Sequence, residues 1–330
     1  MCTAISDIGV CHLFGRTLDL EHSFGEVTAI TPRAFPFDFL YEWNSVYHFA
    51  MIGTAHVRDG IPLYYDAVNE RGLAMAALNF PDAAVYGHSR AGMHNVASFE
   101  LIPWILGRCD SVQSAKELLK STNIVSDSFS SELPPTPLHW LISDRHESIT
   151  VEPLCNGLEI IDNPFGVLTN APRFSYHQTN LSNYMNISPT QQKNRLCPAV
   201  ELKHYSRGMG SIGLPGDMSS ASRFVRAVFA KTHTAFGDNQ QEEISRFFHV
   251  MDTVSQPCGL ARTDEGKPIY TVYTSCIDTS SGAYYYTTYG CRRIQYVHLR
   301  DHNTNGSELI TFPRENEEDI RAARRNTNTI

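Results

Sequence analysis

The second residue of the chain is a cysteine, and it is the residue best equipped to do chemistry. Removal of Met1 is sterically easy when the next residue is as small as cysteine, and it leaves Cys2 with a free α-amine beside its thiol. An α-amine has an ordinary pKa of about 7.7–8.0, so near neutral pH it can accept the thiol proton. Cys2 therefore predicts a nucleophile and a general base within one residue. The alternative is an ordinary second residue without a role.

Two charged residues follow in a largely apolar run. Residues 15–19 read GRTLD and contain Arg16 and Asp19. An arginine beside a thiol favours the thiolate, and a carboxylate can hold and orient an amine. The alternative is a surface ion pair, which contributes little to stability. Because unpartnered charges within an apolar strand are costly, we expect these two residues to be paired.

The elements that would position these residues are strands at both ends of the chain and helices between them. Alternating or apolar runs predict strands at 12–20, 26–33, 49–57, 138–144, 148–154, 157–162, 166–170, 269–277, 283–290 and 294–299. Residues 62–80 predict a hairpin that turns at residues 69–72, where Gly72 can adopt a positive φ. Apolar residues three and four positions apart predict helices at 98–109, 111–121, 219–232 and 242–255. Residues 171–218 form a polar stretch without a predicted element.

This order of elements does not alternate as in βαβ units, so we expect an α+β fold with mixed, mostly antiparallel sheets. Both arms of the 62–80 hairpin are apolar, which indicates a sheet that is covered on both faces. A length of 330 residues suggests about two domains. Since no linker separates them, we expect one domain over 1–330.

Composition excludes several functions. The chain has 27 basic and 35 acidic residues and a net charge of −8, which does not suit binding to nucleic acid or to an anionic membrane. The start of the chain lacks a secretory pattern, and no apolar run reaches the roughly 18 residues of a membrane span. We therefore expect a cytoplasmic protein whose eight cysteines are reduced. No Cys-x-x-Cys pair or histidine spacing predicts a metal site.

One motif matches a known fingerprint in letters only. Residues 208–213 read GMGSIG, the pattern of a dinucleotide-binding turn. That turn works where a strand runs directly into a helix whose N-terminus holds the pyrophosphate. Pro215 and Gly216 follow at once, so we expect no nucleotide site there.

Several groups of residues together resemble the choloylglycine hydrolases, the family of bile salt hydrolases and penicillin V acylases. They are MCTA at 1–4, FGRTLD at 14–19, NERGL at 69–73 with LNFP at 78–81, LHWL at 138–141, NP at 163–164 with LTN at 168–170, and GLPGD at 213–217 with SRFVR at 222–226. The resemblance covers essentially the whole chain in order. It implies an N-terminal-nucleophile hydrolase fold, a four-layer αββα sandwich with two mainly antiparallel sheets. It also implies a homotetramer that needs no cofactor.

The resemblance assigns roles to six residues, namely Cys2, Arg16, Asp19, Asn79, Asn170 and Arg223. It makes Cys2 the nucleophile and base, which Arg16 and Asp19 tune and orient. Asn79 and Asn170 become side chains of the oxyanion region, where amide donors stabilise the charge that develops on a carbonyl oxygen. The alternatives are turn positions for the two asparagines and a solvated helix position for Arg223. Thr17 stands where the family usually has asparagine.

The implied reaction is hydrolysis of the amide bond of glycine- or taurine-conjugated bile acids through a thioester. A sterol needs an apolar pocket, for which the candidates, each of which could equally be core, are Leu18, Phe24, Tyr65, Leu133 and Leu138. Bile salt hydrolases have asparagine where penicillin V acylases tend to have an aromatic residue, so the resemblance at Asn79 implies bile salts rather than penicillin V. Arg207 is a candidate partner for a taurine sulfonate. Two alternatives stay open: a penicillin V acylase, and a non-catalytic protein that binds amphipathic molecules.

Overall fold

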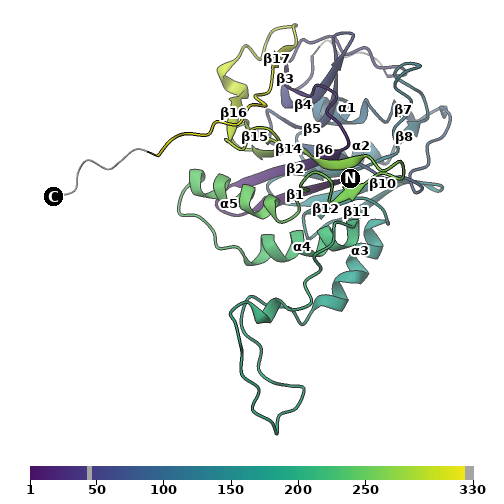
Figure 1. Cartoon of the computed structure of the whole chain (residues 1–330). Coiled ribbons are helices and arrows are strands. Elements are labelled where there is room, and N and C mark those ends of the chain that lie inside the picture. Colours follow the sequence, from purple (N-terminus) through teal and green to yellow (C-terminus); the bar gives the residue numbers. More distant parts are fainter. Residues whose placement is uncertain (43–46, 324–330) are drawn as a thin grey trace.

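Two antiparallel sheets pack face to face at the centre of the structure, a computed structural model that describes residues 1–42 and 47–323 (Figure 1). The first sheet has the order β12 (Val167–Leu168), β1 (Cys2–Ile8), β2 (His12–Leu20), β14 (Pro268–Asp278), β15 (Ala283–Thr288) and β16 (Gln295–His298), with β13 (Ala261–Arg262) beside β14. The second sheet has the order β11 (Gly157–Asp162), β10 (Ser148–Leu154), β9 (Leu138–Ser143), β6 (Ala74–Asn79), β5 (Ile61–Asn69), β4 (Met51–Arg58), β3 (Val27–Thr31) and β17 (Ile310–Phe312).

Helices cover the outer face of each sheet. The first sheet is covered by α3 (Phe174–Leu181), α4 (Ser220–His233) and α5 (Gln240–Asp252), and Figure 1 shows α4 and α5 running beneath β1 and β2. The second sheet is covered by α1 (Leu101–Arg108) and α2 (Val112–Leu119). This is the predicted α+β fold, a four-layer αββα sandwich with two mainly antiparallel sheets.

The two cores explain why the central strands are apolar on both faces. One core fills the space between the two sheets and continues between the first sheet and the helices α4 and α5, and it includes Phe14, Leu141 and Phe247. The other lies between the second sheet and α1, and it includes Trp104 and Trp140. Because successive side chains of a strand point to opposite faces, the neighbours Trp140 and Leu141 belong to different cores.

The hairpin predicted at residues 62–80 is confirmed, with β5 and β6 as its arms. Its turn contains Gly72 with a φ of 90°, a conformation that residues with a side chain rarely adopt. The side chain of Asn69 accepts hydrogen bonds from the backbone N–H groups of Arg71 and Leu73, both at 3.0 Å. These bonds fix the register of β6, which ends at Asn79.

Several elements were missing from the sequence prediction. They are α3, β13, β17, the parallel pair β7 (His94–Ala97) and β8 (Thr122–Val125), and the short 3-10 helices η1 (Ser182–Tyr184), η2 (Met209–Ser211) and η3 (Leu299–Asp301). In α3 only Phe174 and His177 are buried, so the helix has almost no apolar periodicity to detect. The strands β7 and β8 are four residues each and form a separate two-stranded sheet.

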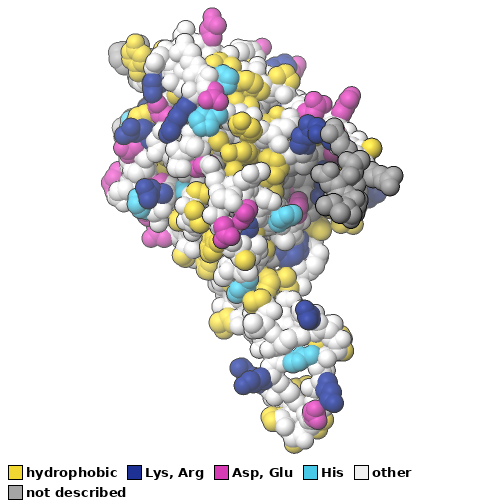
Figure 2. Space-filling model, turned by 90° about the vertical axis from the view of Figure 1, so that its left-hand side faces the viewer, with side chains coloured by type: hydrophobic (Ala, Val, Ile, Leu, Met, Phe, Trp, Pro, Cys, Tyr) yellow, Lys and Arg dark blue, Asp and Glu magenta, His cyan; other side chains and the backbone are white. Residues whose placement is uncertain are grey.

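Residues 186–212, which we call the projecting segment, extend away from the body below α3 and α4 (Figures 1 and 2). Its hydrogen bonds include contacts between its two arms, from Ser188 N–H to the carbonyl of Gly210 and from the Gln191 amide to the carbonyl of Ser206. None of the helices in the described part of the chain combines the length and apolar content that a membrane crossing requires.

Candidate active site

Cys2 begins the first strand and is held by the strand beside it. In the β1–β2 ladder Cys2 lies opposite Leu18 and Ala4 lies opposite Arg16. Met1 continues this pairing, because its amino group donates to the carbonyl oxygen of Asp19 at 2.6 Å and its carbonyl accepts from Asp19 N–H at 2.9 Å. In this state, with Met1 attached, Cys2 is only 3% exposed.

Asn170 and Arg223 hold the backbone of Cys2. The Cys2 N–H donates to Asn170 Oδ1 at 2.8 Å, and Arg223 Nη2 donates to the same oxygen at 2.7 Å. Arg223 Nη1 donates to the carbonyl oxygen of Cys2 and, at 2.7 Å, to Thr3 Oγ1. All four residues are buried, and burial lowers the pKa of Arg223 while nearby Asp19 and Cys2 oppose that effect. The structure thus brings Asn170 and Arg223 together beside the backbone of Cys2.

Arg16 is completely buried. Its Nη1 donates to the carbonyl oxygens of Tyr65, at 3.1 Å, and of Ala77, which fixes the guanidinium against the second sheet. Burial opposes its charge, but Cys2, foremost among the neighbouring groups, raises the pKa of Arg16 above its ordinary value. Arg16 therefore places a permanent positive charge that interacts electrostatically with Cys2. Its Nη2 has no hydrogen-bond partner among the described residues.

The two asparagines of the expected oxyanion region differ in their surroundings. The amide of Asn170 is engaged at both ends, because Oδ1 accepts from Cys2 and Arg223 while Nδ2 donates to the carbonyl of Asn79 at 2.8 Å. The side chain of Asn79 stands at the exposed end of β6. Asn79 therefore has the freer amide, and Asn170 is occupied in holding the nitrogen of Cys2.

The five candidate pocket residues differ in how they relate to the cluster of Cys2, Asn79, Asn170 and Arg223. Leu18 and Tyr65 belong to the same hydrophobic core as Cys2. Leu138 pairs with Asn79 across β9 and β6. Phe24 is 44% exposed and lies against the rings of His22 and His56, while Leu133 closes a turn with Ser130.

Arg207 does not join the Cys2 cluster. It is exposed on the projecting segment, which Figure 1 shows extending away from β1 and β2. Within one chain this position gives no support to the expected contact with a taurine sulfonate.

Ser220 is part of the cluster and was not predicted. Its hydroxyl bridges Thr169 Oγ1, at 2.9 Å, and the carbonyl oxygen of Asn170, at 2.8 Å, and accepts from Asn170 N–H at 2.9 Å. Ser220 begins α4, the helix that carries Arg223, so one helix start positions two residues of the site. Serine is common near the start of a helix because it caps the free N–H groups there, so nothing in the sequence indicated that Ser220 contacts the site.

Two antiparallel sheets between helical layers, with a cysteine at the start of the first strand, form the fold of the N-terminal-nucleophile hydrolases. Comparison with known proteins identifies the family within this class. Residues 2–312 match the linear amide C-N hydrolases of the choloylglycine hydrolase family. The chain is 45% identical over 313 residues to a bile salt hydrolase/transferase of Lactiplantibacillus plantarum, covering 95% of this chain and 97% of that protein.

Solved structures agree with this match. A variant of the conjugated bile acid hydrolase from Clostridium perfringens superimposes with a TM-score of 0.90 at 34% identity, over 98% of this chain and 100% of that one. A penicillin V acylase from Agrobacterium tumefaciens has the same fold, with a TM-score of 0.76 at 18% identity over 95% of this chain and 91% of that one. The chain belongs to the choloylglycine hydrolase family and is a linear amide C–N hydrolase, as the sequence predicted.

Proposed function

We propose that this protein hydrolyses the amide bond of bile acids conjugated to glycine or taurine, with Cys2 as the nucleophile. The observation that carries the proposal is the hydrogen bond from Cys2 N–H to Asn170 Oδ1 at 2.8 Å. Removal of Met1 converts that nitrogen into an α-amine, which Asn170 then holds next to the thiol. The bile acid substrate is supported by the relatives named bile salt hydrolase/transferase and conjugated bile acid hydrolase.

The reaction begins with transfer of the thiol proton of Cys2 to its α-amine, favoured by the charge of Arg16. The thiolate attacks the amide carbonyl carbon, and the electron pair of the C=O bond moves onto oxygen. The amide of Asn79 and backbone N–H groups stabilise that oxyanion. The amine returns its proton to the leaving nitrogen, and glycine or taurine departs. Water, deprotonated by the amine, then cleaves the thioester and releases the bile acid.

In this scheme Asn170 and Arg223 hold the amine, Asp19 orients it, and Asn79 is the side-chain donor of the oxyanion region. The steroid lies against an apolar wall to which Leu18, Phe24, Tyr65, Leu133 and Leu138 contribute. Leu18 and Leu138 support this placement best, because they pair directly with Cys2 and Asn79 in the two sheets.

Initial rates on taurocholate, glycocholate and penicillin V test the substrate. We expect both bile salts to be cleaved faster than penicillin V, with no cleavage by the Cys2→Ser variant. A clear preference for penicillin V would assign the chain to the acylase branch. Binding of bile salts without turnover by protein that lacks Met1 would indicate a non-catalytic binding protein.

We further infer that the whole chain acts as one domain and assembles as a homotetramer in the cytoplasm. The projecting segment supports assembly, because it exposes Leu196 (90%), Leu202 (56%) and Tyr205 (83%) to solvent in a single chain. All eight cysteines are free, which suits a reducing compartment. Sedimentation velocity of the full chain, compared with a variant in which all three of these residues are serine, tests the assembly. A tetramer that is unaffected by the triple substitution would exclude this segment as its interface.

A further inference from the structure

The carboxylate of Asp19 is held by three side chains that the mechanism above does not use. Thr271 Oγ1 donates to Oδ1 at 2.7 Å. Gln256 Nε2 and Thr17 Oγ1 donate to Oδ2, at 3.1 and 3.2 Å. Asp19, Thr17 and Gln256 have no exposed surface, and Thr271 is 4% exposed. The four residues come from β2, β14 and the chain just after α5.

Backbone amides fix the direction of both hydroxyl bonds. Gln256 N–H donates to Thr271 Oγ1 at 2.8 Å, and Thr3 N–H donates to Thr17 Oγ1 at 3.2 Å. A hydroxyl carries one proton and an ionised carboxylate only accepts, so each threonine directs its proton to Asp19. The same rule orients the Gln256 amide, because only its NH₂ end can bond a carboxylate.

Two hydrogen bonds also connect Gln256 and Thr271 directly and fix their relative position. Thr271 N–H donates to the carbonyl oxygen of Gln256 at 3.0 Å, in addition to the bond between Gln256 N–H and the threonine hydroxyl. The other end of the glutamine amide, Oε1, is buried and has no hydrogen-bond partner among the described residues. The glutamine side chain is thus held in the core chiefly by its bond to Asp19.

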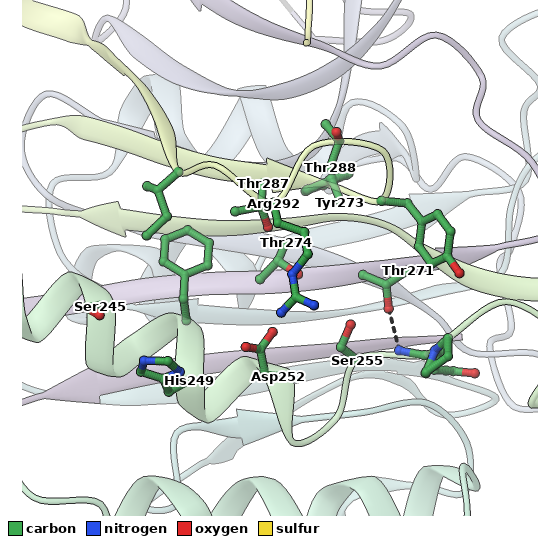
Figure 3. A pocket seen from close by; sticks show the side chains of 15 residues that line it. Ser245, His249, Asp252, Ser255, Thr271, Tyr273, Thr274, Thr287, Thr288 and Arg292 are labelled. Atoms are coloured by element: carbon green, nitrogen blue, oxygen red, sulfur yellow. Dashed lines mark hydrogen bonds between the residues drawn. The ribbon is translucent and has the colours of Figure 1, made fainter. Parts of the chain in front are cut away.

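A cavity of about 650 Å³ lies immediately beyond this pair, between α5 and the strands β14 and β15. Figure 3 shows Thr271 and Ser255 at one end of it and Thr274 and Thr287 further along the sheet. Gln256 lines the cavity as well, so it forms a wall between Asp19 and this open space. Gln256 and Thr271 therefore bond Asp19 on one side and line the cavity on the other.

We propose that Gln256 and Thr271 are positioning residues, which set the orientation and the effective charge that Asp19 presents to the α-amine of mature Cys2. The inference rests on the proposed function, because it takes Asp19 to orient that amine. Arg16 on the same strand and Arg223 on α4 both interact electrostatically with Asp19, and both also interact with Cys2. The two donors, one on each carboxylate oxygen, withdraw negative charge from Asp19.

The test measures the alkylation rate of Cys2 by iodoacetamide against pH, using protein that lacks Met1 and peptide mass spectrometry to separate Cys2 from the other cysteines. Removing a donor leaves more negative charge on Asp19, which favours the protonated amine and thiol. We expect the alkylation curve of Gln256→Met and of Thr271→Val to move to higher pH. We also expect kcat on taurocholate to fall about tenfold or more with little change in KM, the scale of one hydrogen bond to a charged group.

Thr271→Ser keeps the hydroxyl and should restore the wild-type curve. Thr274→Val makes the same chemical change on the same strand within the same cavity, and Gln295→Met removes a glutamine amide that contacts Tyr286 instead. Both controls should leave the curve in place. Curves that coincide for Gln256→Met, Thr271→Val and wild type, or controls that shift equally, would overturn the proposal.

The alkylation assay separates this inference from the proposed function, because it needs no substrate. Wild-type protein that cleaves no bile salt contradicts the proposed function, while displaced alkylation curves still support the positioning role. Thr271→Val and Gln256→Met act on different oxygens of Asp19, so a folding failure of one variant leaves the other to decide.

Discussion

Asn170 Oδ1 accepts the backbone N–H of Cys2 at 2.8 Å, so the structure joins this asparagine to the nitrogen of the first strand rather than to its sulfur. Arg223 donates to the same oxygen at 2.7 Å. One buried oxygen therefore links a guanidinium on α4 with the Cys2 nitrogen, which the proposed mechanism uses as the base. The position of that nitrogen is set by an amide 168 positions away in sequence.

Asn170→Ala should lower both activity and stability. It removes the acceptor of two buried donors, and an unsatisfied buried donor costs roughly 1–3 kcal/mol. We expect kcat to fall about a hundredfold or more and the melting temperature to drop, measured by steady-state kinetics and calorimetry. Asn163→Ala is the matched control, because Asn163 is 2% exposed and bonds Thr150 and Val167. If both variants lose kcat equally per folded molecule, Asn170 has only a structural role.

Retention of Met1 should abolish turnover while leaving the fold unchanged. Met1 extends the β1–β2 pairing through its two bonds to Asp19, and its peptide bond withdraws the lone pair of Cys2 nitrogen. A lysine inserted between Met1 and Cys2 blocks removal of Met1 and supplies the test. Intact mass and activity are measured on the same preparation. Activity at the wild-type level from chains that keep their methionine would rule out the α-amine as the base.

Asn79→Ala should reduce kcat with little effect on stability. Asn79 is exposed at the end of β6, and removal of one oxyanion donor costs about 10²–10³-fold in kcat. Its backbone carbonyl, which accepts from Asn170, is unaffected by the substitution. Thermal melts and kinetics on glycocholate check both parts. A variant with normal kcat would show that Asn79 does not stabilise the oxyanion, which would leave Asn170 or backbone N–H groups as the donors.

Much of the fold was predictable because apolar periodicity and turn chemistry act locally. The hairpin around Gly72 and the helix that carries Arg223 follow from residues that are close in sequence. The parallel pair β7–β8 was missed because its strands are short and come together only through the tertiary fold.

The candidate site divides in the same way. Three of the site residues could be recognised from the sequence, because a cysteine at position 2 and two charges in an apolar strand are unusual. They are Cys2, Arg16 and Asp19, and they lie within one hairpin. Gln256 and Ser220 carry no such signal, since a buried glutamine and a serine at a helix start are ordinary in sequence. Their roles follow from bonds across 237 and 50 positions, which only the packing of α4 and α5 against the first sheet creates.

A histidine far from Cys2 in the β1–β2 ladder should make stability depend on pH. His12 is 5% exposed at the start of β2, and its ring nitrogens contact Ser6, Ser143 and Thr279 at 2.8–3.2 Å. Burial is the main cause that lowers the pKa of His12 to about 4, with Lys231 adding to it and two nearby aspartates opposing it.

The sign follows from the two pKa values. An unfolded histidine titrates near its ordinary pKa of 6.5, so between about pH 6.5 and 4 the unfolded chain binds more protons than the folded chain. The free energy of unfolding should therefore decrease as pH falls through this window, by about 3 kcal/mol in total. Well above pH 6.5, by about one pH unit or more, the histidine is neutral in both states and contributes no pH dependence.

Urea denaturation of wild type and His12→Gln at several pH values from about 7 to 4.5, at one protein concentration, measures this contribution. The variant should show a flatter dependence of the unfolding free energy on pH, whatever its stability at neutral pH. His249→Gln, at an exposed position of α5, is the matched control and should keep the wild-type slope. Because the comparison uses slopes, a general loss of stability in His12→Gln cannot imitate the result. Equal slopes for His12→Gln and wild type would show that the buried ring is not the group that titrates.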